Sequence, residues 1–552
     1  MKTILGAAIG NCVHIAGIYH FLKIAESEGY QTTLIGTAVP IKQLCELIKK
    51  EKPSIVAISY RLTPEVASAL FKDLQLELKK NNFSNQRLIF GGTPSVAKIA
   101  EESGLFEKVF NGNESIDQIK AYLTGGSDII TEKSFSNDLI GRINQKYPYP
   151  LLRHHFGRPT LDETLKGITA IAGSGVLDVI SIGPDQNAQE HFFHPELMDH
   201  TQDGAGGVPL RKFEDLQAIY SNSRCGNYPL LRCYAGTQDL LHWAQMSVDT
   251  IHNAWGAIPL CWYSELDNRS TRTLEEAISE NQQVIKWYAE QGIPVEVNES
   301  HQWSLRDAHD SLAVVMAFLA AYNAKKLGVR NYISQFMMNT PPGTSPEMDI
   351  AKMLAKKELI EELEDKNFTM YREVRAGLAH FSSNPMVAKG QLASSALIGL
   401  ALKPHIYHVV GFSEGDHASL PEELIESCEI VHGVFRNCLH GMPDFTNSKT
   451  IVKRKIALIY EARILLKVLK DFGKEMSSDP WSDPKVLSLA IRNGILDTPH
   501  FQGNQNLYGQ VRTRIIHGAC YAINEKNGSP MDEDERTSRI LMNIQSVVKQ
   551  NI

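Results

Sequence analysis

Apolar and polar positions alternate in two successive series along the chain. In residues 2–124, short apolar runs are separated by segments whose apolar residues recur at the spacing of an α-helix. Short strands that alternate with helices predict a parallel sheet covered on both faces, here a flavodoxin-like, doubly wound (Rossmann-like) domain. The strands predicted by the pattern are Thr3–Ile9, Gln31–Ile35, Ser54–Ser59, Arg87–Phe90 and Lys108–Phe110, and the helices between them include Ile18–Glu28, Ile41–Lys50 and Glu65–Lys80.

The second series begins near residue 148 and is longer. Its eight strand-and-helix repeats predict a (β/α)₈ barrel of the TIM type. The expected strands are Tyr149–Arg153, Leu177–Ile182, Leu230–Tyr234, Ile258–Tyr263, Val295–Asn298, Asn331–Met337, Val374–His380 and His405–Gly411. Amphipathic patterns between or after them include Leu274–Glu290, Ala308–Leu327, Met348–Leu363 and Glu422–Leu439.

We therefore expect an α/β chain with three domains. Residues 1–128 form the doubly wound domain, 129–147 lack a clear pattern and are predicted as a linker, and 148–445 form the barrel. A C-terminal extension, 446–552, begins with a long helix at Ile451–Phe472, continues in loops and ends in a segment predicted to be a polar tail.

Composition narrows the functional class. The formal net charge is −7 and no basic run occurs, so the electrostatic footprint of a nucleic-acid-binding protein is missing. No stretch approaches the ~20 apolar residues that a membrane span needs. The 8 cysteines are scattered without a Cys-x-x-Cys pair, which argues against a disulfide framework, a zinc ribbon or an iron–sulfur cluster. We expect a cytoplasmic protein that acts on a small molecule, without nucleic acid or membrane.

Polar side chains follow several of the predicted barrel strands. The carboxyl ends of barrel strands carry the catalytic residues of this fold, so these side chains mark the expected active face. A zinc site built from the histidines is a minor alternative, because adjacent residues of a strand point to opposite faces. The clusters are Arg153-His154-His155, Asp185-Gln186-Asn187, Gln238-Asp239, Glu299-Ser300-His301, His380 and Glu414-Gly415-Asp416-His417.

Three short motifs follow the first, third and fourth predicted strands. They are Gly10-Asn11-Cys12-Val13-His14-Ile15-Ala16-Gly17, Ser59-Tyr60-Arg61 and Gly91-Gly92-Thr93. Ligands of doubly wound sheets bind at the carboxyl ends of the strands, where all three motifs fall. Together they resemble the cobalamin-binding domain of corrinoid enzymes, whose pattern is Asp-x-His-x-x-Gly, Ser-x-Leu and Gly-Gly.

The resemblance implies a role for each matching residue. His14 would replace the cofactor's own lower base as the cobalt ligand. Gly17, Gly91 and Gly92 would let the backbone approach the flat corrin. Ser59 would line the slot for the nucleotide tail of the cofactor.

Two positions depart from that pattern. Cys12 stands where the family has the aspartate that orients the histidine and raises its basicity, and a thiol is a poor substitute for a carboxylate. The sequence leaves open whether Asn11 or a backbone carbonyl takes over that role, or whether His14 is a weaker ligand. Arg61 replaces the leucine, and either pairs with a corrin amide or phosphate or is simply solvated.

The barrel half resembles the large catalytic subunit of the glutamate mutase (methylaspartate mutase) family, over residues 150–520. In that family the cobalamin-binding subunit and the barrel subunit are separate chains, whereas this chain has both, with the cobalamin-binding part first. The resemblance implies adenosylcobalamin, held between the two domains, and a radical that abstracts hydrogen from a substrate inside the barrel. The stretches that carry it are Gly236-Thr237-Gln238-Asp239, Trp287-Tyr288-Ala289-Glu290-Gln291-Gly292, Leu327-Gly328-Val329-Arg330-Asn331 and Asn493-Gly494-Ile495-Leu496-Asp497-Thr498-Pro499.

The family's substrate residues carry over only in part. Three arginines that hold the carboxylates of glutamate fall on His155, Tyr234 and Gln283, although Arg153, Arg158 and Arg232 lie nearby in sequence. Since two-point carboxylate binding depends on guanidinium groups, a substrate other than glutamate is expected.

Two further family contacts fall on identifiable positions. The family's glutamate that contacts the substrate ammonium matches Glu299, for which a salt bridge at the barrel rim is an equal alternative. The adenosine-contacting loop falls on Asn504 through Arg514, with Asn504 in place of the family's lysine.

These observations predict an adenosylcobalamin-dependent radical carbon-skeleton mutase, an isomerase that acts on a small polar acid or amino acid. A corrinoid methyltransferase with methylcobalamin and a non-catalytic cobalamin sensor or carrier are the alternatives. An aminomutase that also uses pyridoxal phosphate would need a lysine at the barrel mouth, and the sequence identifies none. The sequence leaves the oligomeric state open, with a homodimer among the options.

Overall fold

The chain is divided into two compact units, Met1–Thr131 and Glu132–Ile552. The computed structural model describes residues 2–114, 116–125, 131–234, 236–377, 381–439 and 441–550. His380, one of the polar residues predicted at the barrel mouth, lies outside the described residues. The boundaries predicted at 128, 147 and 445 stay predictions.

The first unit is a five-stranded sheet with the strand order β2-β1-β3-β4-β5, and every adjacent pair is parallel. This is the flavodoxin-like order, so the predicted doubly wound domain is confirmed. Its strands are β1 (Thr3–Ile9), β2 (Gln31–Val39), β3 (Ile55–Ser59), β4 (Leu88–Gly91) and β5 (Lys108–Phe110). Its helices are α1 (Ala16–Ser27), α2 (Ile41–Glu51), α3 (Pro64–Lys80), α4 (Pro94–Ser103) and α5 (Ile116–Thr124).

Burial explains why the runs of this unit become strands. All five residues of β3 are buried, as expected for a central strand covered on both faces. Helices α3 and α4 each begin with a proline directly after the loops that follow β3 and β4, where the missing N–H costs nothing. These loops are therefore short and end at fixed places on the carboxyl edge of the sheet.

The second unit contains an eight-stranded parallel sheet in the order β8-β7-β6-β13-β12-β11-β10-β9, curled into a barrel. The predicted (β/α)₈ barrel is thereby confirmed. Its two end strands meet through the backbone N–H of Ala254, which donates to the carbonyl of Leu231 at 2.9 Å. The strands are β6 (Leu151–Phe156), β7 (Val179–Ile182), β8 (Leu230–Cys233), β9 (Gly256–Ile258), β10 (Val295–Val297), β11 (Asn331–Met337), β12 (Thr369–Arg375) and β13 (Ile406–His408).

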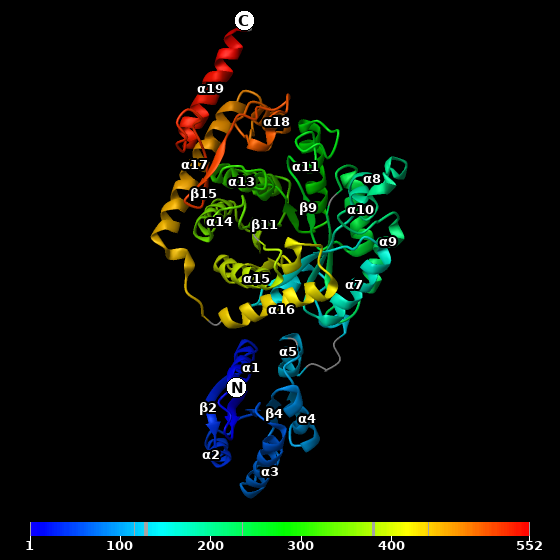
Figure 1. Cartoon of the computed structure of the whole chain (residues 1–552), viewed down its shortest axis with the longest axis vertical. Helices are drawn as coiled ribbons and strands as arrows, with labels where there is room; N and C mark the ends of the chain where they lie inside the picture. Colours follow the sequence, from blue (N-terminus) through cyan, green and yellow to red (C-terminus); the bar gives the residue numbers. More distant parts are fainter. Residues whose placement is uncertain are drawn as a thin grey trace. The chain divides into compact units, whose positions relative to one another are not determined.

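Helices surround these strands, as Figure 1 shows for the barrel. Several begin with a side-chain cap: the Thr160 hydroxyl accepts from the N–H of Glu163, and Thr273 forms a reciprocal capping box with Glu276. The helices of the barrel are α7 (Leu161–Ser174), α8 (Gln186–His191), α9 (Phe213–Asn222), α10 (Leu240–Ile251), α11 (Leu274–Glu290), α12 (Ser300–Ser304), α13 (Asp310–Lys326), α14 (Pro346–Glu361), α15 (Pro385–Gly399) and α16 (Pro421–Cys438).

The structure differs from the sequence prediction in the segment between the two sheets. Residues 139–146 of the predicted linker form helix α6 (Leu139–Lys146). Buried charges hold it: Lys146 pairs with Asp178 at 2.8 Å, and Arg142 donates to the carbonyls of Asn227 and Tyr228. The buried face of this helix combines apolar Leu139 and Ile143 with basic Arg142 and Lys146, so its apolar pattern alone is too short to predict a helix.

The C-terminal extension is a second difference. The predicted long helix is present as α17 (Lys449–Gly473), which packs against α13 and α14 and is followed by α18 (Pro484–Arg492) and the hairpin β14 (Thr513–Ile516) and β15 (Ala519–Ala522). The segment predicted as a polar tail is instead helix α19 (Glu533–Gln550), which packs against α17.

A buried polar cluster attaches α19 to the barrel. Glu533 contacts the His309 ring just before α13 and pairs with Arg536 at 2.7 Å, while Arg536 donates to the carbonyls of Gly494 and Ile495. A polar sequence becomes an ordered helix here because its charged residues are satisfied inside the fold.

Among the described residues, one helical segment, Pro385–Leu402, is long and apolar enough to cross a membrane, by length and composition only. It comprises α15, which lies between β12 and β13 of the barrel, and the helical turn that follows it.

The Glu533 cluster makes stability sensitive to acid. Burial alone would raise the pKa of Glu533, but the charges of Arg536 and His309 outweigh it and lower the pKa to about 2. The carboxylate therefore stabilises the fold above its ordinary pKa of 4.5, and this contribution is lost as the pH falls from there toward 2. We expect Glu533→Gln to lower the free energy of unfolding at pH 7 by roughly 3 kcal/mol.

Urea unfolding of wild type and Glu533→Gln, at pH 7 and at pH 3, measures this effect. The difference between the two proteins should shrink at the lower pH. Glu535→Gln, which removes an exposed pair with Arg539, is the matched control and should change little. Equal stability of Glu533→Gln and wild type at pH 7 would contradict the assignment.

Candidate functional site

The three motifs of the first unit meet at one edge of its sheet. They follow β1, β3 and β4, which are direct neighbours in the strand order. The chain leaves β1 through Gly10, whose φ of 67° suits a residue without Cβ, and reaches α1 after a loop that carries His14. The strand order reverses between β1 and β3, and this is the place where doubly wound sheets bind ligands.

His14 is exposed, whereas Cys12 beneath it is fully buried. The Cys12 Sγ lies 3.8 Å from the His14 Nδ1, in the position from which a second group can orient the ring. Asn11 does not fill that position, because its amide oxygen accepts from the Tyr60 hydroxyl at 3.3 Å. Of the groups considered from sequence, the thiol is therefore the one in contact with Nδ1, which leaves Nε2 for a ligand.

The remaining motif residues differ in how much room surrounds them. Ser59 ends β3 with 8% of its surface exposed, and its buried Oγ has no hydrogen-bond partner among the described residues. A Cβ added to Gly17 or Gly91 would meet no atom within 4 Å, so open space faces both glycines. At Gly92 a Cβ would lie 2.7 Å from the Tyr60 carbonyl oxygen, so this glycine is required by packing. Arg61 is exposed.

Exposed apolar side chains surround the His14 loop. Val13 lies beside His14 and is 61% exposed, and Leu62 follows β3 and is 39% exposed. Tyr19 and Val66 are exposed near the starts of α1 and α3. Because these elements start at the carboxyl ends of β1 and β3, the edge that carries the histidine has exposed apolar side chains beside the polar Asn11 and Arg61.

In the second unit, the barrel interior holds two buried ion pairs. Arg153 on β6 pairs with Glu373 on β12 at 2.8 Å, and Arg232 on β8 pairs with Glu296 on β10 at 2.8 Å. All four side chains are fully buried. The indole Nε1 of Trp255 also donates to Glu296 at 2.8 Å. Each pair spans an intervening strand, so the pairs join parts of the barrel that share no backbone hydrogen bonds.

These charges are distributed unevenly around the barrel. The arginines lie on the arc β6–β8, and the acceptors Glu296, Gln335 and Glu373 lie on the facing arc β10–β12. Several of their buried polar atoms have no hydrogen-bond partner among the described residues. The unpaired donors are Arg153 Nε, Arg232 Nε and Arg232 Nη1, and the unpaired acceptors are Glu296 Oε1, Gln335 Oε1 and Glu373 Oε2.

His155 and Tyr234, predicted at the substrate site, do lie together. Their rings stack with centroids 4.6 Å apart, and the Tyr234 hydroxyl is 2.6 Å from His155 Nε2. The ring of His408 on β13 packs edge-on against His155, with centroids 4.7 Å apart. Burial, reinforced by the charge of Arg153, lowers the pKa of His155 and of His408 well below the usual value, so both rings are neutral at pH 7.

Glu299 and Gln283 are placed differently. Glu299 is fully buried, and its two carboxylate oxygens accept from the backbone N–H groups of Leu260 and Cys261 and from the indole of Trp303. Its contacts are thus neither a rim salt bridge nor an open carboxylate, and they fix the loop after β9. Gln283 is exposed on α11, outside the barrel, and is not brought together with His155 and Tyr234.

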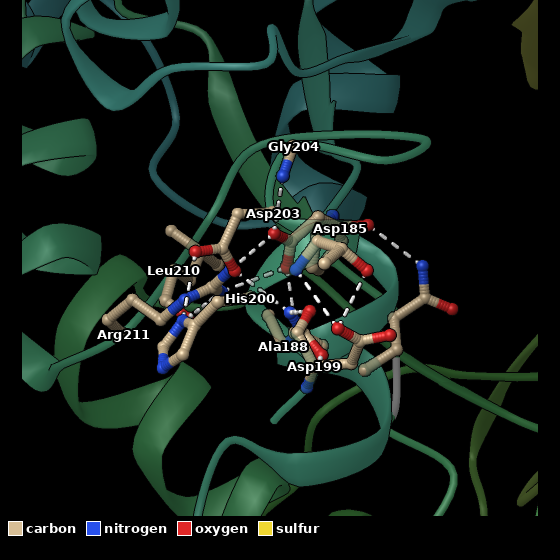
Figure 2. Close-up of polar contacts among 12 residues, drawn as sticks. Asp185, Ala188, Asp199, His200, Asp203, Gly204, Leu210 and Arg211 are labelled. Atoms are coloured by element: carbon tan, nitrogen blue, oxygen red, sulfur yellow. Dashed lines mark hydrogen bonds and ion pairs between the residues drawn. The ribbon is translucent and has the colours of Figure 1, made fainter. Parts of the chain in front are cut away.

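The long loop after β7 is organised by Asp185, another of the predicted polar residues. Its carboxylate caps α8 through the N–H of Ala188, accepts from the N–H of Gly204, and receives two hydrogen bonds from Arg211 at 2.9 and 2.6 Å. Arg211 also pairs with Asp203. Figure 2 shows these contacts, which bring the two ends of the loop together at a fully buried carboxylate.

The predicted adenosine loop is shaped by Asp497, which the sequence comparison had not singled out as a functional residue. Its buried carboxylate accepts from the N–H groups of Gly509, Gln510 and Val511. Asn504 lies in this loop and its side chain accepts from the N–H of Asn506, while Arg514 is exposed on β14. These contacts fix the backbone of residues 509–511 to Asp497.

The minor zinc alternative finds no support in the described part of the chain. Among those residues, no group of three or more His, Cys, Asp or Glu side chains is arranged to hold a metal ion. A single histidine such as His14, which would complete the coordination of a metal that is already held by a macrocycle, is a different case.

No family model matches the chain. A cobalamin-binding protein from Desulfitobacterium hafniense DCB-2 is 24% identical over 23% of this chain and 59% of its own length, with a TM-score of 0.20. The cobalamin-dependent S-adenosylmethionine radical enzyme OxsB is 11% identical, with 100% of this chain and 81% of that chain covered and a TM-score of 0.19. The methanol:cobalamin methyltransferase complex MtaBC from Methanosarcina barkeri is 9% identical, with coverages of 90% and 80% and a TM-score of 0.16.

The chain thus spans 59% of the length of the first of these proteins. TM-scores of 0.20 or less do not establish a shared fold between this chain and any of the three proteins. Its function has to be inferred from its own residues.

The buried pair of Arg153 and Glu373 can be tested by its effect on the stability of the fold. Removing one partner leaves the other charge buried and unpaired, so Arg153→Met or Glu373→Gln alone should each lower the free energy of unfolding by about 3–5 kcal/mol. The double variant should lose much less than the sum of the two, because no unpaired charge remains.

A double-mutant cycle from urea unfolding measures this coupling. Asp162→Asn, which breaks an exposed pair with Lys166 on α7, is the control and should leave stability unchanged. Simple additivity of the two barrel substitutions would show that Arg153 and Glu373 do not act as a pair.

Proposed function

We propose that the first unit binds cobalamin, with His14 as the cobalt ligand. The observation that carries this proposal is the convergence of the three motifs at the carboxyl edge of three neighbouring strands. A lone histidine in a loop would be unremarkable, but His14, Ser59 and Gly91 lie at the ends of β1, β3 and β4 in the order that the corrinoid motif requires. Convergence of separate motifs on one edge is the pattern of a binding site.

The residues present fit the group. Ser59 has a buried hydroxyl without a partner among the described residues, which a polar group of the cofactor's nucleotide tail can satisfy. Gly17 and Gly91 leave open the space that a side chain would fill. The exposed side chains of Val13 and Leu62 offer apolar contact to a flat macrocycle.

Cys12 would take the orienting role that an aspartate has in the motif. If the Nδ1–H of His14 donates to the Cys12 sulfur, Nε2 keeps its lone pair for the metal. A thiol accepts a hydrogen bond less strongly than a carboxylate does, so it withdraws the Nδ1 proton less and makes the imidazole a weaker donor to cobalt. His14 would therefore bind the metal, but less firmly than in the Asp-x-His pattern.

We further propose that the barrel interior binds a small polar acid or amino acid and that the chain is an adenosylcobalamin-dependent mutase. Adenosylcobalamin, when bound, supplies a carbon-centred radical by homolysis of its Co–C bond. The unpaired donors on the arc β6–β8 suit a carboxylate, and the unpaired acceptors on the arc β10–β12 suit an ammonium or hydroxyl group.

The protein's own part in such a reaction is to hold the substrate and exclude water. Arg153 and Arg232 are each paired with one glutamate, so these four charges cancel and leave only N–H donors for a ligand, which disfavours the two carboxylates of glutamate. His155 and Tyr234 stand where the resemblance placed arginines, and they offer a neutral imidazole and a hydroxyl instead of guanidinium groups. A buried interior of this kind protects a reactive intermediate from solvent.

Coordination by His14 can be read directly from the metal. We expect the Co(II) form of cobalamin, bound to the chain labelled with ¹⁵N-histidine, to show a doublet superhyperfine splitting in its EPR spectrum, against a triplet with unlabelled protein. His14→Ala should abolish this change, since no histidine nitrogen then reaches cobalt. His20→Ala, on the adjacent helix, is the control.

A splitting that does not respond to the label would refute His14 as the ligand. Bound methylcobalamin that passes its methyl group to an acceptor, with no radical signal under turnover, would point to the methyltransferase instead of the mutase. Failure of the chain to bind any cobalamin would remove the proposal as a whole.

Substitutions at Gly91 and Gly92 distinguish an effect on cobalamin binding from an effect on folding. Gly91→Val fills open space, so the fold should keep its stability while cobalamin affinity falls at least tenfold, because the added side chain occupies the ligand's place. Gly92→Ala drives a Cβ against the Tyr60 carbonyl, so it should lower the melting temperature with or without cofactor. Thermal unfolding and absorbance titration of both variants provide the measurements, and unaltered cobalamin affinity of Gly91→Val would count against a corrin at this edge.

A further inference from the structure

The geometry around His155 determines which ring nitrogen carries the proton. Arg153 Nη2 lies 2.9 Å from His155 Nε2, and a guanidinium can only donate. The Tyr234 hydroxyl reaches the same nitrogen at 2.6 Å. Nε2 must therefore offer its lone pair, so a neutral ring carries its proton on Nδ1. Within the described residues this buried Nδ1 has no hydrogen-bond partner.

We propose that His155 is a substrate-binding residue that offers Nδ1–H to an oxygen acceptor of the ligand, in a tautomer imposed by Arg153 and Tyr234. The tautomer follows from the contacts alone, whereas the identity of the acceptor as a substrate oxygen rests on the proposed function of the barrel. The ligand class is a small molecule with a carboxylate or carbonyl oxygen. A neutral N–H donor at this position binds an oxygen acceptor, and unlike a guanidinium it does not require that oxygen to carry a full negative charge.

The surroundings keep this donor neutral over a wide pH range. Burial is the largest cause that lowers the pKa of His155, followed by the positive charges of Arg153 and Arg232. Because both burial and the nearby positive charges disfavour the imidazolium, the ring does not change its protonation between pH 5.5 and 8, and its N–H donor stays available. The titratable and charged groups around the ring are Arg153 and His154 on β6, Arg232 on β8, Tyr234 just after β8, Arg375 on β12 and His408 on β13. Glu373 on β12 contacts both Arg153 and His408.

The chain contains an internal reference of the opposite tautomer. His432 on α16 places Nε2 2.9 Å from the carbonyl oxygen of Val176, and a carbonyl can only accept. Its Nε2 must therefore carry the proton. Burial lowers the pKa of His432 to about 4, so this ring is also neutral at pH 7.

Magic-angle-spinning NMR of the full chain labelled with ¹³C,¹⁵N-histidine tests the tautomer. The signals lost in His155→Gln belong to His155, and those lost in His432→Gln belong to the reference. We expect Nδ1–H for His155 and Nε2–H for His432, both unchanged from pH 5.5 to 8. An imidazolium or an Nε2–H tautomer at His155 would overturn the proposal.

Acetate and L-alanine are the probes for the binding role. Either should shift the His155 Nδ1 resonance of wild type, and His155→Gln should bind the responding probe roughly tenfold more weakly, the loss typical of one hydrogen bond. Tyr234→Phe should retain the tautomer, because Arg153 still donates to Nε2. An Nδ1 resonance that ignores both probes, up to the highest concentration at which the protein stays folded, would reject the binding role.

This test is independent of the cofactor. Cobalamin binding, followed by the absorbance of the corrin, reports on the first unit, which carries the proposed ligand His14, and it is measured separately from the His155 resonance. A chain that binds cobalamin but leaves the His155 resonance unchanged by either probe would retain the cofactor proposal and lose this one. The reverse result would keep His155 as a ligand-binding residue of a barrel with another chemistry.

Discussion

Closure of the barrel is the constraint on which the second unit depends. The two end strands of its sheet are β8 and β9. In the described structure, the backbone hydrogen bond from the N–H of Ala254 to the carbonyl of Leu231 joins them, in place of a complete β-ladder. The Arg232–Glu296 pair bridges this seam from β8 to β10, and Trp255, just before β9, donates to the same glutamate. A buried ion pair is costly to desolvate and gains little net stability. Its value here is specificity, because only the closed barrel brings Arg232 and Glu296 together.

The polarity of the barrel interior follows from these pairs. Each arginine on one arc is paired with a glutamate on the other, so their charges cancel, and the pairs leave N–H donors on one side and acceptor oxygens on the facing side. One guanidinium, that of Arg153, also reaches His155 and fixes the protonation of its ring. The contacts that hold the barrel together thus also decide what the interior offers to a ligand. Under the proposed function, these donors and acceptors would bind a small acid in place of the three substrate arginines of the glutamate mutase family.

The first unit shows how a departure from a motif can be accommodated. The side chain that replaces the expected aspartate, Cys12, lies against the His14 ring, while Asn11 is engaged by Tyr60. In the proposed cobalamin site, the Cys12 thiol would take the place of the orienting carboxylate and make a weaker contact. The fully buried position of Cys12 shows that packing, besides chemistry, selects a small side chain there.

The sequence by itself determined the class of both units. Strand and helix periodicity predicted the doubly wound sheet and the eight-fold barrel, because a parallel strand buried on both faces and an amphipathic helix each leave a local pattern. The spacing of Gly10–Gly17, Ser59 and Gly91 relative to the strands likewise placed all three motifs at one edge. Local signals sufficed wherever the burial of apolar residues decides the structure.

Tertiary structure alone decided the roles of the polar residues. Arg153 and Glu373 each have one apolar and one charged or polar neighbour in sequence, so no local pattern marks them as inward-facing partners 220 residues apart. Glu299 and Gln283 were assigned by position in a resemblance, and the fold turned one into a fully satisfied loop anchor and placed the other on an outer helix face. Helices α6 and α19 were missed because charged residues share their buried faces with only a few apolar ones, and charged residues are ordinarily taken to be exposed. An ion pair or a tautomer depends on which side chains are in contact in the folded chain. Because those side chains are distant in sequence, no local pattern in a single sequence predicts the contact.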